Sequence, residues 1–160
     1  MNLNKIIFFC VGLTETFKEL TKGYKPEKHL DLLFESLCGS TNFVAKEIKE
    51  ISEKSQKEFK DNSSKNILKL LKEKSNSELY PSRLLNLGIY TLISNSQDFK
   101  EKKESEMNKI ISDVFEELNL SVNKAEKDIG IFKSSISKME QARELIEELR
   151  IKDKKKEEKK

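Results

Sequence analysis

A heptad repeat between Ser121 and Arg150 constrains the fold of this chain more than any other feature. Apolar side chains recur there at alternating steps of three and four residues, at Val122, Ala125, Ile129, Phe132, Ile136, Met139 and Ile146. A stripe kept over about four heptads makes one helix bury a narrow ridge against another helix. We therefore predict a long helix over residues 120–151 that packs or binds a partner and does not catalyse.

The composition favours helices throughout the chain. Apolar residues make up 36% of the 160 residues and charged residues 37%, so a single domain with a small core and long solvated helix faces is expected. Lys, Glu, Leu and Ile dominate, and there are two prolines and five glycines. We predict an all-α fold, with a bundle of about six short helices over residues 1–119 followed by a long, partly projecting coiled-coil-like helix.

Apolar stripes at helical spacing locate the six short helices. They run from Ile6 to Leu20, from Pro26 to Cys38, from about Val44 to Phe59, from Ser63 or Ser64 to Leu71, from Ser82 to Ser94, and from Met107 to Leu118. The third helix has a thin stripe and is expected to be peripheral. The fifth is apolar all round and is expected at the centre, where Gly88 indicates a close approach by a neighbouring helix. Polar connections are predicted over residues 74–80 and 96–104.

The net charge of +3 resides at the end of the chain. Residues 151–160 hold six lysines and three acidic residues, which accounts for the whole surplus. Elsewhere charges of both signs alternate along helix faces, so we predict no nucleic-acid binding. Residues 152–160 are expected to form a frayed tail, with a weak attraction to an anionic membrane surface.

The cysteines and the one histidine give little reason to expect a metal site. Cys10 and Cys38 lie among apolar neighbours at helical spacing, where cysteine behaves as a small hydrophobe, and both suit a reducing compartment. A zinc site would need both to converge on His29, and no two of these three residues are closely spaced as zinc ligands usually are. We predict no metal and no cofactor.

Catalytic motifs are also missing from the sequence. It contains neither a Gly-x-Ser-x-Gly elbow nor a glycine-rich phosphate loop. Arg83 can pair with a partner's carboxylate or with an internal acid or helix end, and the internal role is favoured. Lys127 and Asp128 are expected to be paired on or near the surface. We therefore predict a protein that is not an enzyme and has no small-molecule substrate.

The apolar run from Ile6 to Leu13 is too short to span a membrane, and no cleavage site for a signal peptide follows it. We expect neither a transmembrane helix nor a signal peptide.

Three sequence blocks in register resemble a known family. The first holds Gly23, Tyr24 and Pro26 followed by Phe34 and Cys38, the second Ser82, Arg83, Gly88 and Tyr90, and the third Lys127, Asp128, Met139, Gln141 and Ala142. Together they resemble the thylakoid formation protein family, also known as photosystem-II-associated proteins, of cyanobacteria and chloroplasts. The blocks span nearly the whole chain.

The resemblance implies an all-helical protein that is peripheral to the thylakoid membrane, on its cytoplasmic or stromal side. It implies a role in photosystem II biogenesis and repair, with the membrane AAA protease that removes damaged subunits, or photosystem II components, as partner. It transfers no catalytic residue. The alternative is a generic helical coiled-coil adaptor unrelated to photosynthesis.

The chain departs from the family pattern at three places. Family members usually carry a further helical segment ahead of the position of Ile6, so apolar surface on the first helix is expected to be uncovered. Val44 replaces a helix-capping Asp, which weakens the start of the third helix unless Thr41 or Asn42 substitutes. Gly130 interrupts the long helix where a better helix former is usual.

The long helix admits two arrangements, and the sequence leaves the oligomeric state open. Either Val122 to Met139 folds back on the domain and the part from Gln141 projects, or the whole seam is intermolecular. Arg143 and Arg150 occupy heptad positions where like charges would repel in a homodimer, so partial docking is favoured. A partner would then contact the distal residues Arg143, Ile146, Leu149 and Arg150.

Overall fold

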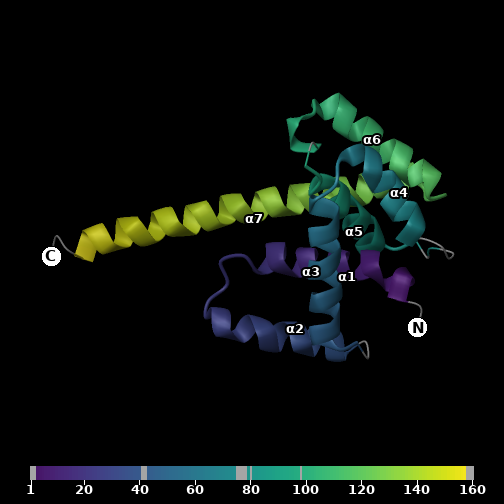
Figure 1. Ribbon diagram of the computed structural model, residues 1–160. Helices are drawn as coiled ribbons and strands as arrows, with labels where there is room; N and C mark the ends of the chain where they lie inside the picture. The colour runs from purple at the N-terminus through teal and green to yellow at the C-terminus, as the bar shows by residue number, and fades with distance from the viewer. Residues whose placement is uncertain (1–2, 41–42, 75–78, 80, 98, 158–160) are drawn as a thin grey trace.

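A computed structural model describes residues 3–40, 43–74, 79, 81–97 and 99–157. Within these residues the chain is all helical and contains no strand, which confirms the predicted fold class. Figure 1 shows a bundle from which one helix extends far to one side. The elements are α1 (Leu3–Thr21), the 3-10 helix η1 (Glu27–His29), α2 (Leu30–Gly39), α3 (Ala45–Lys60), α4 (Ser64–Lys74), α5 (Arg83–Ser94), the 3-10 helix η2 (Phe99–Glu101), α6 (Glu104–Glu117) and α7 (Val122–Glu157).

Helices α1 and α5 cross at the centre of the bundle through two glycines. A Cβ atom added to Gly88 would lie 1.7 Å from the carbonyl oxygen of Phe8. One added to Gly12 would lie 1.8 Å from the carbonyl oxygen of Leu84. Only glycine allows two helix backbones to come this close, so the close approach predicted at Gly88 is confirmed, and Gly12 is its counterpart on α1.

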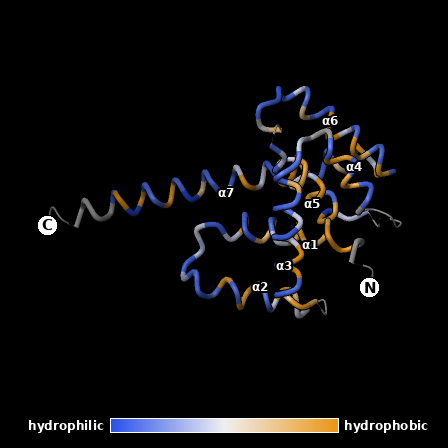
Figure 2. Tube along the Cα trace, in the orientation of Figure 1, coloured by the Kyte–Doolittle hydropathy of each residue, from blue (hydrophilic) through white to orange (hydrophobic). Residues whose placement is uncertain are grey.

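Helix α1 is buried on two faces, whereas the sequence predicted a single apolar stripe on it. Phe8 and Val11 are fully buried in the main core with residues of α5, α6 and α7. Cys10 belongs to a second cluster with Phe34, Cys38 and Ile48 of α2 and α3. Helix α1 therefore shares the central position that the sequence assigned to α5 alone, and both helices contain hydrophobic stretches in Figure 2.

The turn between α1 and α2 differs from the prediction. Gly23 has a φ of 79°, the left-handed conformation expected where α1 stops. Pro26 is extended and precedes η1, and α2 begins only at Leu30, so Pro26 is not the first residue of α2 as predicted. In the same way, α5 begins at Arg83, and the Ser82 hydroxyl caps it by accepting the Leu85 N–H at 3.1 Å.

Two further predictions about burial are wrong. Helix α3 is not peripheral, because Ile48 and Phe59 are buried, at 2% and 0% exposure. The connection over residues 96–104 is not simply polar, because Phe99 of η2 packs into the main core. Val44 precedes α3 without a capping side-chain hydrogen bond, as expected from its replacement of Asp. Its possible substitutes, Thr41 and Asn42, lie outside the described residues, as do most of residues 74–80.

Only half of the predicted stripe on α2 is covered. Phe34 and Cys38 are buried, whereas Leu33 and Leu37 are 41% and 43% exposed. The reason is that α2 touches α1 and α3 along one edge, through contacts such as the edge-to-face pair of Phe17 and Phe34.

Helix α7 packs on the bundle with its first part and leaves it with the second. Asn119, at a φ of 55°, ends the turn after α6, and the Ser121 hydroxyl accepts the Lys124 N–H at 3.4 Å. Ala125 and Ile129 are buried, whereas every described side chain from Glu144 to Lys152 is exposed. The helix passes through Gly130 without a break and continues to Glu157, beyond Lys152, where the sequence predicts the start of a frayed tail.

Candidate protein-binding surfaces

A buried carboxylate joins α5 to α7. Asp128 is 5% exposed and accepts hydrogen bonds from Arg83 Nε at 3.2 Å and from Asn86 Nδ2 at 2.9 Å. Arg83 thus pairs with an internal acid, which was the favoured role. The Asp128 side chain is 7% exposed and that of its partner Arg83 is 62% exposed, while the neighbouring Lys127 is exposed. The sequence analysis missed Asn86, although an amide inside an otherwise apolar helix is a signal for such a partner.

A clasp between α1 and α7 marks the point where α7 leaves the bundle. Arg143 Nη2 donates to the carbonyl oxygen of Glu19 at 3.3 Å, in the last turn of α1. Lys22 Nζ lies 3.6 Å from Glu140 Oε1, and Gly23 lies against the Arg143 side chain. A cation at a helix C-terminus is favourable, because the last carbonyls of the helix lack partners within it. Arg143, which the sequence places among the free partner-binding residues, is therefore half-buried against the domain.

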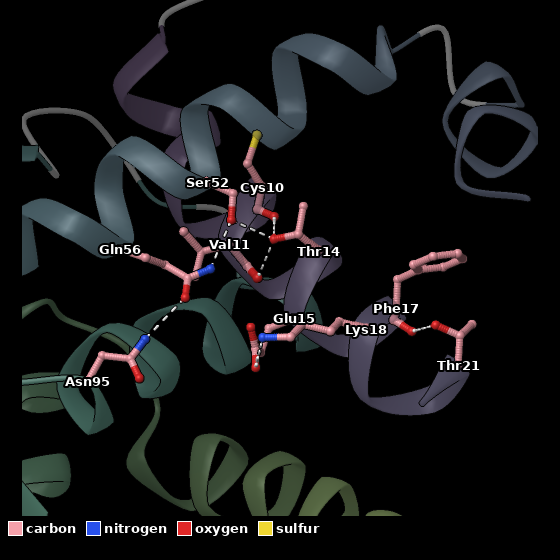
Figure 3. A network of polar contacts seen from close by, with 10 residues as sticks. All are labelled: Cys10, Val11, Thr14, Glu15, Phe17, Lys18, Thr21, Ser52, Gln56 and Asn95. Carbon is pink, nitrogen blue, oxygen red and sulfur yellow. Dashed lines mark hydrogen bonds and ion pairs between the residues drawn. The ribbon is translucent and has the colours of Figure 1, made fainter. Parts of the chain in front are cut away.

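A cleft of about 520 Å³ opens between α1, α2 and α3, and its polar side chains hold one another (Figure 3). Ser52 Oγ lies 2.5 Å from Thr14 Oγ1, which donates to the carbonyl oxygens of Cys10 and Val11. Gln56 Nε2 donates to Ser52 Oγ, and Asn95 Nδ2 donates to Gln56 Oε1, both at 3.2 Å. The network links α1 and α3 to the C-terminal end of α5. The hydroxyl groups of Thr14 and Ser52 are therefore used in hydrogen bonds between helices.

The two thiols share the buried cluster between α1, α2 and α3. Burial, and secondarily the neighbouring Cys38, raises the pKa of Cys10 to about 12. Burial also raises the pKa of Cys38, although Lys49 opposes this. Both thiols are therefore neutral near pH 7 and poor nucleophiles. His29 is exposed in η1, and the described part of the chain contains no group of three His, Cys, Asp or Glu residues placed to hold a metal ion.

The distal part of α7 presents exposed apolar side chains beyond the bundle. Leu145, Ile146 and Leu149 are 58%, 51% and 52% exposed, and Ile151 is 45% exposed. Figure 2 shows hydrophobic segments alternating with hydrophilic ones along the part of α7 that extends beyond the bundle. Exposed apolar side chains on a helix of this kind are typical of a surface that another helix covers.

The structure distributes the other family-pattern positions over the bundle. Tyr24 and Pro26 are exposed in the turn after α1, and Gln141 and Ala142 are exposed on α7. Tyr90 is half-buried with Lys133 Nζ 5.1 Å from its ring centroid, and Met139 is half-buried. Among the described residues, no helix combines the length and the apolar character needed to cross a bilayer.

Comparison with known proteins decides the family. A family model described as thylakoid formation protein matches residues 3–160. The chain belongs to the thylakoid formation protein family. Among family relatives, Protein Thf1 of Prochlorococcus marinus strain MIT 9312 is 83% identical over 148 residues, which is 92% of this chain and 74% of that protein. Protein Thf1 of Prochlorococcus marinus subsp. pastoris is 68% identical over 147 residues, covering 92% of this chain and 73% of that protein.

A solved structure supports the fold of this family member. The structure titled "Structure of Psb29 at 1.55A" superposes with a TM-score of 0.78, covering 94% of this chain and 76% of that chain. The sequences are 23% identical, so the similarity establishes the shared helical fold.

Proposed function

We propose that this protein is a non-enzymatic factor in thylakoid and photosystem II biogenesis and repair, and that it acts by binding another protein. Membership of the thylakoid formation protein family supports the setting. The observation that carries the binding role is the distal part of α7, where Leu145, Ile146 and Leu149 are each more than half exposed beyond the bundle.

The proposed partner is the membrane AAA protease that removes damaged photosystem II subunits, or a component of photosystem II itself. The protein would act at the cytoplasmic side of the thylakoid membrane, as a peripheral protein. The support for this partner is the similarity of the three sequence blocks to the family. The apolar surface of distal α7 supports a protein as the occupant, because about half of a typical protein interface is apolar.

The experiment is a deletion strain that is exposed to strong light. The proposal predicts slower recovery of photosystem II activity and less of the AAA protease, with both restored by the full chain. A chain with Leu145→Asp and Leu149→Asp should accumulate but fail to restore either. Ile151→Asp is the matched control, because it changes an exposed apolar residue on the opposite side of α7. Unchanged recovery and protease amount in the deletion strain would refute the proposal.

The second candidate is a helical coiled-coil adaptor with no role in photosynthesis. Co-purification separates the two, since only the photosystem II factor should be enriched with thylakoid membranes through the distal part of α7.

A further inference from the structure

The charges on the distal part of α7 are sorted between two sides of the helix. Successive residues of an α-helix are rotated by about 100°. Over residues 138–152 one half of the circumference carries four basic and five apolar side chains: Lys138, Met139, Ala142, Arg143, Leu145, Ile146, Leu149, Arg150 and Lys152. The other half carries the acidic side chains Glu140, Glu144, Glu147 and Glu148, with Gln141 and Ile151. The apolar stripe thus has Lys152 along one edge and Arg143 and Arg150 along the other, with Lys138 within the stripe and the acidic residues behind it.

The basic edges are accessible in this structure. Lys138, Arg150 and Lys152 are exposed beside an apolar stripe whose leucine and isoleucine side chains are more than half exposed. Arg150 Nη1 lies 3.9 Å from Glu147 Oε2 one turn away, and both side chains are about two-thirds exposed. Such a surface pair contributes little, so it does not compete strongly with a partner. Arg143 differs, because it contacts the end of α1.

A second copy of this chain is a poor occupant of the stripe. In a parallel helix pair opposite edges meet, and in an antiparallel pair like edges meet. Because both edges are basic here, either arrangement would bring positive charges together. An anionic membrane would accept the basic edges, but residues 138–152 contain no aromatic residue, and the binding of a helix to a bilayer scales with the apolar area that it inserts.

We propose that the distal segment of α7, residues 138–152, binds an amphipathic helix of another protein whose apolar stripe is bordered on both edges by Asp or Glu. Leu145, Ile146 and Leu149 would supply the apolar contact, and Lys138, Arg150 and Lys152 would select the acidic edges. The inference rests on the proposed function in one respect, which is that a protein binds to distal α7. It adds the charge pattern by which that protein is selected.

The test uses the full chain and two synthetic helical peptides of four heptads each. Both carry Leu at positions a and d, and one has Glu and the other Lys at positions e and g. Fluorescence anisotropy should show that the chain binds the Glu peptide at least about tenfold more tightly than the Lys peptide. The double variant Lys138→Glu/Arg150→Glu should reverse this preference.

A control variant separates the position of the charges from their sum. Glu148→Lys/Arg150→Glu exchanges two charges between the halves of the helix and keeps the net charge. If position matters, it should weaken binding of the Glu peptide severalfold, and circular dichroism should show unchanged helix content. Unchanged binding by this variant would contradict the inference.

Four other outcomes would overturn the inference. They are equal binding of both peptides or no binding of the Glu peptide, retention of the chain by phosphatidylglycerol vesicles but by neither peptide, and self-association through the distal helix in sedimentation equilibrium. The proposed function fails by a different observation, which is normal photosystem II repair in the deletion strain.

Discussion

The crossing of α1 and α5 and the distal part of α7 are opposite uses of a helix in one small protein. At the crossing, Gly12 and Gly88 let two backbones touch, and the surrounding residues such as Phe8 and Ile89 are fully buried. In distal α7 every described side chain beyond Arg143 is exposed. The comparison teaches that the residues that hold the bundle together and the exposed apolar residues of α7 lie in separate segments, so each set can be changed without the other.

The largest expected effect comes from filling the crossing. Gly88→Ala would place its Cβ within 2 Å of the Phe8 carbonyl oxygen, where the backbone has no room to move away without separating α1 from α5. We expect a loss of more than about 3 kcal/mol in the free energy of unfolding, or no folded protein at all. Urea denaturation measures it.

Gly130→Ala is the matched control for this substitution. A Cβ at Gly130 meets no described atom within 4 Å, and the residue is exposed in a helix. It should raise stability by up to about 1 kcal/mol because alanine has the higher helix propensity. Equal effects of the two substitutions would show that the crossing is not as tight as described.

The next largest effect should follow from removing the carboxylate that joins α5 to α7. Asp128→Ala leaves the buried Asn86 amide without its acceptor and Arg83 without its partner. We expect a loss of about 2 kcal/mol in the free energy of unfolding. Lys127→Ala, at the exposed neighbour, should change it by less than about 0.5 kcal/mol. If Asp128→Ala lowers the free energy of unfolding no more than Lys127→Ala does, the hydrogen bonds of Asp128 do not stabilise the fold.

Alkaline pH should also lower stability, through the buried thiol on α1. The pKa of Cys10 is raised from its ordinary value of 9.0 to about 12 by burial, so the unfolded chain loses this proton before the folded chain does. The contribution of Cys10 to stability is complete below pH 9 and should be lost as the pH rises from about 9 to about 12. Urea denaturation at several alkaline pH values should give a shallower decline for Cys10→Ala. Identical slopes for the two proteins would contradict the assignment.

The smallest effect on stability should come from the distal helix itself. A chain that ends after Gln141 loses the hydrogen bond from Arg143 to Glu19 but keeps every buried residue of α7. We expect a folded protein with a cooperative transition and a loss of about 1 kcal/mol or less. Loss of the cooperative transition in the truncated chain would show that distal α7 is part of the core.

The sequence predicts where the helices lie along the chain better than it predicts which helices pack against one another. Particular residues show why. Gly88 predicts a close approach because glycine destabilises a buried helix unless a neighbouring backbone needs the space. Gly12 lies outside the apolar stripe predicted for its helix, so only the observed crossing of α1 and α5 reveals its role. The stripe of α2 predicts an amphipathic helix correctly, yet whether Leu33 and Leu37 are covered depends on what lies opposite them. Periodicity carries no information about that.

The candidate surface was predictable in part. The heptad pattern places Ile146 and Leu149 on one face of a helix, and both are exposed. The position of Arg143 could not be predicted, because its hydrogen-bond partner is a backbone carbonyl of α1, 124 positions away in the chain. Likewise, Asn86 and Asp128 lie 42 positions apart, and only the packing of α7 on α5 brings them together.

The most direct test of the central claim is a quantitative pull-down from intact thylakoid membranes. It compares the full chain with two variants at exposed positions of α7, Leu145→Asp/Leu149→Asp and Ile151→Asp, and measures the amount of the membrane AAA protease and of photosystem II subunits retained. The account predicts that the first variant loses the retained protein and the second keeps it. Equal retention by the full chain and both variants would contradict it.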